Sequence, residues 1–63
     1  MNGQRLKDLV RLEGRHVGLA LNDGSRIDDC QLVFAGRERV WVWANGRDTF
    51  VALPTVSDFW EAS

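Results

Sequence analysis

Arginine and tryptophan residues alternate near the middle of this chain. Arg39, Trp41 and Trp43 follow one another at intervals of two, with Arg37 before them and Arg47 after them. Two kinds of binding use these residue types. Tryptophan and arginine are enriched among the residues that anchor protein–protein contacts, and aromatic rings flanked by arginines also bind single-stranded nucleic acid by stacking on bases and neutralising phosphates. The pattern therefore predicts an interaction surface whose ligand is a protein or, alternatively, single-stranded RNA.

Other side chains of the types that catalyse reactions or bind metals stand apart from one another. His16 has no base or nucleophile near it in the sequence, and Cys30 is expected in the core as a small apolar residue. Asp28 and Asp29 are adjacent, so on a strand they point to opposite faces, and no third ligand is near them. We therefore expect no catalytic residue, no metal site and no cofactor. A minimal enzyme is the least favoured of the three function classes.

The length of the chain limits it to one small domain, residues 1–63. A domain of this size buries only just enough apolar surface to offset the entropy lost on folding. One cysteine and one histidine cannot form a disulfide or a structural metal site within the chain. Self-association is therefore the expected source of additional stability.

The composition argues against several classes of protein. A hydrophobic fraction of 44% argues against disorder, and a net charge of −1 argues against binding to duplex DNA. The longest apolar run, Val40 to Ala44, is far too short to span a bilayer, and the N-terminal sequence lacks the apolar core of a signal peptide. We therefore expect a cytoplasmic protein with no membrane partner.

A helix followed by strands is expected to position the arginines and tryptophans. The helical spacing of the first apolar residues predicts a short helix over residues 4–12, with Asn2 as its N-cap and Gly14 as its stop. From Val17 the apolar period changes to two, which indicates a strand that ends in the turn Asn22-Asp23-Gly24. This three-residue turn places Ile27 opposite Leu19. The apolar residues that follow reach the same face only if a β-bulge near residues 28–29 bends the second strand.

Asn45-Gly46 is a strong signal for a two-residue hairpin. In the strands on either side of it, Trp41 pairs with Phe50 and Trp43 pairs with Asp48. With a further turn at residues 36–38, four strands in meander order result. After Pro54, a last helical turn is expected to carry Val56, Phe59 and Trp60.

Strand parity divides the apolar residues between two faces of this sheet. One face holds the expected core: Val17, Leu19, Leu21, Ile27, Cys30, Leu32, Phe34, Val40, Val42, Val51 and Leu53. The other face holds Val33, Trp41, Trp43, Phe50 and Ala52, with Arg39 beside them. Two interpretations of this second face remain open. Either the N-terminal helix, the Phe59-Trp60 segment or the curvature of the barrel covers it, or it is an interface with a partner.

The segment from Leu9 to Leu32, LVRLEGRHVGLALNDGSRIDDCQL, resembles the first motif of the Sm-like proteins, part of the wider group of small SH3-like β-barrels. The shared features are a helix before Gly14, an apolar alternation that leads to Gly24, and a bent second strand. The resemblance implies a small barrel and a tendency to form rings. The family's uridine-binding loop usually carries an Asp and an Asn, which residues 35–39 lack, and its second motif is absent from DTFVALPTV. No RNA-binding residue is therefore carried over from the family.

The predicted fold is mainly β: a small, strongly bent antiparallel barrel with a short N-terminal helix and a C-terminal helical turn. The predicted function is that of a non-catalytic interaction module that binds a further copy of itself or another protein. The expected interface residues are Val33, Arg39, Trp41, Trp43 and Phe50. The alternative is an Sm-like RNA-binding protein that forms a homo-oligomeric ring. In that case the RNA-binding residues are Arg37, Arg39, Arg47 and Trp43.

Overall fold

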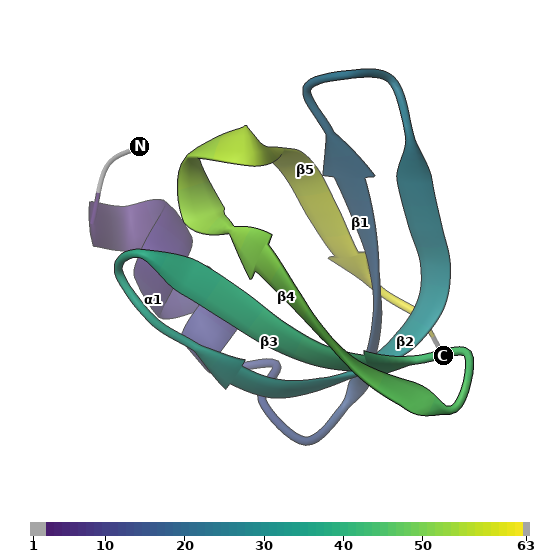
Figure 1. The fold of residues 1–63 in the computed structure, drawn as a ribbon. Helices are drawn as coiled ribbons and strands as arrows, with labels where there is room; N and C mark the ends of the chain where they lie inside the picture. Colours follow the sequence, from purple (N-terminus) through teal and green to yellow (C-terminus); the bar gives the residue numbers. More distant parts are fainter. Residues whose placement is uncertain (1–2, 63) are drawn as a thin grey trace.

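The computed structural model describes residues 3–62, which form a bent antiparallel sheet with a short helix beside it (Figure 1). The elements in chain order are the helix α1 (Gly3–Val10), the strands β1 (His16–Leu21), β2 (Arg26–Ala35), β3 (Arg39–Ala44) and β4 (Arg47–Ala52), the 3-10 helix η1 (Leu53–Thr55) and the strand β5 (Val56–Glu61). The strand order across the sheet is β4-β3-β2-β1-β5. The prediction of a mainly β, antiparallel fold with a short N-terminal helix is confirmed.

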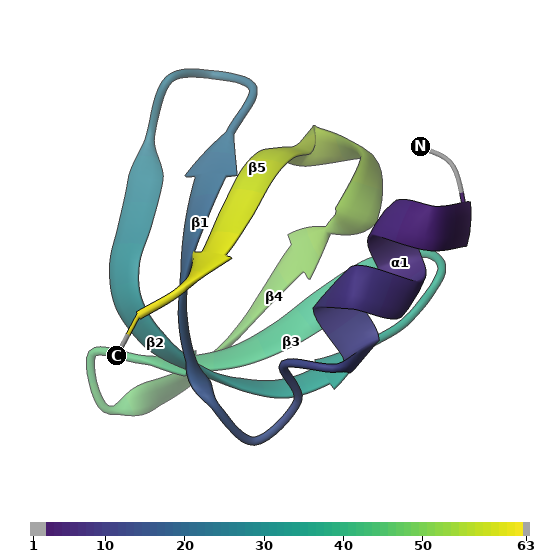
Figure 2. The ribbon, with the colours of Figure 1, turned by 180° about the vertical axis from the view of Figure 1, so that it is seen from behind.

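Helix α1 lies close to the connection between β2 and β3 (Figure 2). Its Leu9 is only 1% exposed and belongs to the core, so the helix covers part of the sheet's buried face. The helix ends at Val10, somewhat earlier than predicted, and Gly14 has a φ of +85° in the turn that leads to β1. The predicted cap, Asn2, lies outside the described residues. Within residues 3–62, no helix has both the length and the apolar character needed to cross a membrane.

Strand β2 bends the sheet because its two halves pair with different strands. Its first half pairs with β1 and its second half with β3. A β-bulge interrupts the first pairing, since Val17 lies opposite Cys30 but Leu19 lies opposite Ile27. An extra residue on one strand increases local twist and bends that strand. The predicted bulge near residues 28–29 and the predicted position of Ile27 are both confirmed.

The hairpin between β3 and β4 also forms as predicted. Asn45 and Gly46 have φ angles of +54° and +76°, the left-handed values that a tight two-residue hairpin turn requires. Trp41 pairs with Phe50. Two residues nearer the turn, Trp43 pairs with Asp48. The alternation of side chains on these strands is therefore fixed by the turn.

Phe34 is not a core residue, contrary to the sequence-based prediction. The pairing of β2 with β3 shifts between Leu32 and Phe34, so β2 contains a second irregularity that local alternation did not indicate. Ala35 takes the buried position instead, at 4% exposed, and Phe34 is 55% exposed on the other face. Phe34 thereby joins the face that carries the tryptophans.

The predicted helical turn over Val56, Phe59 and Trp60 is wrong in its position. The helical turn is the 3-10 helix η1, which includes Pro54, and the residues after it form β5. Strand β5 pairs antiparallel with β1. This pairing satisfies the backbone groups along the second edge of β1, and such a long-range requirement outweighs a local capping signal.

The buried residues come from α1, from η1 and from one face of the strands, which we call the inner face. They are Leu9, Val17, Leu19, Cys30, Leu32, Ala35, Val40, Val42, Ala44, Val51, Leu53 and Val56. Leu21 and Ile27, also predicted in the core, are partly buried and pack against it. We call the opposite side of the sheet the outer face.

Candidate interaction surface on the outer face

Three aromatic side chains form a row across the outer face. Phe34 on β2 is paired with Trp41 on β3, and Trp41 is paired with Phe50 on β4. The rings of Trp41 and Phe50 are stacked, with centroids 5.6 Å apart and planes inclined by 29°. Phe34 and Phe50 are 55% and 57% exposed. This set, the aromatic row, runs across three neighbouring strands and ends on β4, at the edge of the sheet.

Polar contacts hold the rings of the aromatic row in place. The indole Nε1–H of Trp41 donates a hydrogen bond to Asp48 Oδ1 at 2.9 Å. The Arg39 guanidinium lies 5.6 Å from the centre of the Phe50 ring, a cation–π distance. The Phe34 ring lies against Gly36, where a Cβ atom would come within 3.0 Å of it. A surface whose rings are already ordered loses little side-chain entropy when it binds.

An open groove of about 590 Å³ follows the aromatic row toward the turn between β2 and β3. Its lining residues are Phe34, Gly36, Arg37, Glu38, Arg39, Trp41 and Phe50. The groove therefore combines exposed rings with charged side chains of both signs at its border.

The predicted site residues are only partly brought together. Trp43 and Val33 are on the outer face and are 46% and 38% exposed. Arg37 and Arg39 border the groove. Arg47 is separate, because it follows the Asn45-Gly46 turn at the opposite end of β3 and is paired with Ala44.

Among the described residues, neither the helix nor the Phe59-Trp60 segment covers Phe34, Trp43 or Phe50, so that part of the alternative interpretation is wrong for these three rings. Arg5 of α1 lies over the ring of Phe59, 5.5 Å from its centre, at the β5 edge of the sheet. Trp60 lies against Gly18 of β1. The large exposed fractions of Trp43 and Phe50 show that these rings are uncovered in the single chain.

A second aromatic contact on the outer face was not predicted. Trp60 is paired with Gly18, and a Cβ atom at position 18 would collide with the indole ring. Arg26 lies over this ring, 5.1 Å from its centre, and also forms an ion pair of 2.8 Å with Asp28. The sequence signal was the glycine inside a strand, which often marks a close approach of another group.

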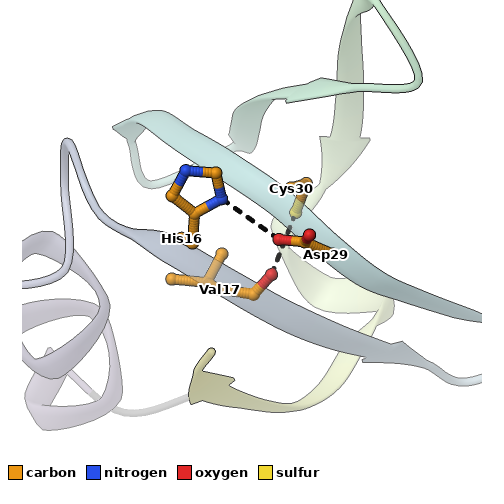
Figure 3. Close-up of polar contacts among 4 residues, drawn as sticks. All are labelled: His16, Val17, Asp29 and Cys30. Carbon is orange, nitrogen blue, oxygen red and sulfur yellow. Dashed lines mark hydrogen bonds and ion pairs between the residues drawn. The ribbon is translucent and has the colours of Figure 1, made fainter. Parts of the chain in front are cut away.

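His16 and Cys30, the remaining candidate residues of β1 and β2, each make a local contact (Figure 3). His16 Nδ1 lies 3.1 Å from Asp29 Oδ1, and both side chains are exposed. The Cys30 thiol points inward and donates to the carbonyl oxygen of Val17 at 3.4 Å. Burial, followed by the negative charge of Asp29, raises the pKa of this thiol. Among the described residues, no group of three or more His, Cys, Asp and Glu side chains is arranged to hold a metal ion.

Comparison with known proteins does not assign the chain to a family. No protein-family model matches the sequence, and a search of curated proteins finds no significant match.

Proposed function

We propose that this chain is a non-catalytic interaction module that docks onto a protein surface through its outer face. The partner is a further copy of the chain or a different protein. The interface consists of the aromatic row together with Arg39, Trp43 and Val33. The observation that carries this proposal is the exposure of Phe34, Trp43 and Phe50 on one face of so small a chain.

The energetics of exposed aromatic rings support this assignment. A phenylalanine or tryptophan side chain can bury about 150–250 Å² on association. Soluble monomers seldom expose several such rings side by side, and exposed patches of this kind are common at interfaces. Here the rings are also held in place by Asp48 and Arg39.

The charges around the rings favour a protein over a polyanion. Glu38 lies between Arg37 and Arg39 at the border of the groove, and Asp48 is bonded to Trp41. Mixed charges of this kind suit the polar rim of a protein interface, whereas a phosphate backbone prefers basic groups without neighbouring carboxylates.

Sedimentation velocity on charged variants tests the proposal for docking between copies. Phe50→Glu is expected to abolish association, because a charge would be buried in the interface. Val10→Glu is the matched control, since Val10 is also an exposed apolar residue but lies on α1. Both variants should keep the circular dichroism spectrum of the wild type. Equal association by the two variants would contradict the proposal.

As a second candidate, we propose that the chain is an Sm-like barrel that forms a ring and binds single-stranded RNA. The bulged and bent β2 supports the relationship, as do the guanidinium groups of Arg37 and Arg39 beside exposed rings. Binding to an unstructured oligonucleotide should then weaken steeply with salt, and the double variant Trp43→Ala, Arg39→Ala should lose it. Absence of binding at low salt would exclude this candidate.

A further inference from the structure

Strand β4 presents unpaired backbone groups along the edge of the sheet. Hydrogen-bonded and non-hydrogen-bonded pairs alternate along an antiparallel ladder, and the pair that flanks a two-residue turn is hydrogen-bonded, which here is Ala44 with Arg47. Every second pair counted from Ala44 and Arg47 is then hydrogen-bonded, which leads to Glu38 and Leu53 at the other end of the ladder. The Leu53 N–H does donate to the Glu38 carbonyl oxygen, at 2.9 Å. The N–H and C=O groups of Asp48, Phe50 and Ala52 therefore point away from β3.

The two edges of the sheet differ in how their outward backbone groups are used. At the β5 edge, Arg5 donates to the Ser57 carbonyl oxygen at 3.0 Å, and the Phe59 N–H donates to Asp58 Oδ1 at 2.8 Å. At the β4 edge, the Thr55 hydroxyl donates to the Ala52 carbonyl oxygen. Within the described residues, no hydrogen bond is made to the outward groups of Asp48 or Phe50. In the part of the chain that the structure describes, β4 thus has fewer of its outward backbone groups bonded than β5, which makes β4 the more open edge for an added strand.

We propose that a second copy of the chain adds its own β4 to this edge, antiparallel and about a twofold axis that passes beside Phe50. This inference goes beyond the proposed function, because the second copy pairs with the edge of the sheet beside Phe50 and leaves the outer face of the joined sheet open to a partner. The two sheets then become one continuous sheet, and the aromatic row continues from one copy into the other. The interface is isologous, so two copies satisfy it and the assembly closes as a dimer.

The sequence of β4 selects one register for this pairing. Placing Phe50 opposite Phe50 of the second copy puts Asp48 opposite Ala52 and uses all three residues whose backbone groups point outward. The Ala52 carbonyl oxygen then accepts a second hydrogen bond beside the one from the Thr55 hydroxyl. Centring the axis on Asp48 would place two carboxylates opposite each other, which is destabilising. The Phe50 register therefore gives the most backbone hydrogen bonds and no directly opposed like charges.

The same register brings opposite charges together across the dimer. Arg39 is paired with Ala52 on the outer face of its own copy. Asp48 of the second copy then lies on the far side of Ala52, two strands away from Arg39. Two strand spacings are about 10 Å, a distance that an arginine and an aspartate side chain together span over a small alanine. The twofold axis produces this complementary pair twice.

Charge exchange at position 50 tests the register by sedimentation equilibrium. Phe50→Lys and Phe50→Glu should each be monomeric, because like charges meet at the axis. An equimolar mixture of the two variants should recover a one-to-one dimer, because lysine then faces glutamate. Circular dichroism checks that each variant is folded, as expected for a side chain that is 57% exposed.

Ala52→Pro tests the backbone pairing while leaving every aromatic and charged side chain in place. Ala52 has a φ of −64°, a value that proline also adopts. Its N–H points away from β3, and no hydrogen bond from it is found among residues 3–62. This variant should be folded and monomeric, whereas the control Ala52→Ser should remain a dimer like the wild type.

Four results would overturn the inference. They are a monomeric wild-type chain at sub-millimolar concentration, a larger ring, a mixture of the position-50 variants that stays monomeric, or a dimer that survives Ala52→Pro. If the dimer survives Ala52→Pro but not Phe50→Glu, docking by the outer face stands without strand pairing. If it survives both, docking between copies through the outer face falls as well.

Discussion

At the scale of single residues, Gly18 decides where the C-terminal tryptophan can lie. The indole of Trp60 rests directly on the backbone of β1, and any side chain at position 18 would occupy the same space. The Arg26 guanidinium lies over the same ring. The role of this glycine is therefore steric and depends on Trp60 being present.

Gly18→Ala should lower the free energy of unfolding by about 1–3 kcal/mol, the usual cost of forcing a group into filled space. The same substitution made in a Trp60→Ala background should have almost no effect. Urea denaturation of the four proteins in this cycle measures the coupling. An equal cost in both backgrounds would show that the strain comes from the backbone and not from the indole ring.

The Cys30 thiol should make stability depend on pH in alkaline solution. Its pKa is raised in the folded chain by burial and by Asp29, so the unfolded chain ionises first as the pH rises and unfolding becomes more favourable. The protonated thiol therefore contributes its full stabilisation below the ordinary thiol pKa. This contribution is lost as the pH rises from there through the raised pKa of the folded chain. The chain contains no tyrosine that would titrate in the same range. Cys30→Ala should lose this part of the pH dependence in denaturation curves, and unchanged pH dependence would contradict the assignment.

At the scale of elements, the parts predicted correctly are those specified by nearby residues. Asn45-Gly46 specifies a turn and therefore a register, and apolar spacing alone located the bulge near residues 28–29. The irregularity at Phe34 and the strand β5 were missed, since both depend on pairing with distant segments. The outer-face surface was predicted through Trp41 and the hairpin, whereas the contribution of Phe34 required the structure.

Substitutions at positions 32 and 34 of β2 test the observed register. Leu32 is fully buried and Phe34 is 55% exposed. Leu32→Ala should therefore cost about 2–5 kcal/mol, whereas Phe34→Ala should cost less than about 1 kcal/mol. Denaturant unfolding of the two variants measures both values. A comparable loss of unfolding free energy for Phe34→Ala would show that the Phe34 ring is buried in the core, and would contradict the observed register.

At the scale of the whole molecule, the small size of the chain and its exposed aromatic rings both favour association with a partner. A chain of 63 residues has little stability to spare, and its outer face leaves Trp43 and Phe50 in water. The association that we propose through that face would bury the rings and stabilise the folded chain, because a partner that binds only the folded state shifts the folding equilibrium.

Thermal stability should therefore depend on protein concentration. The midpoint of unfolding of the wild type is expected to rise as the protein is concentrated, while that of Phe50→Glu should stay constant. Differential scanning calorimetry over a wide concentration range compares the two. A wild-type midpoint independent of concentration would show that association between copies does not support the fold.

Site-specific photocrosslinking tests the central claim most directly, because it detects a further copy and a different protein alike. A benzophenone amino acid replaces Trp43 on the outer face or, as the control, Val10 on α1, and cells making each protein are irradiated. We expect a discrete protein adduct from position 43, lost on adding Phe50→Glu, and none from position 10. The mass of the adduct identifies the partner as a second copy or another chain. No adduct from position 43, or the same adduct from both positions, would contradict docking by the outer face.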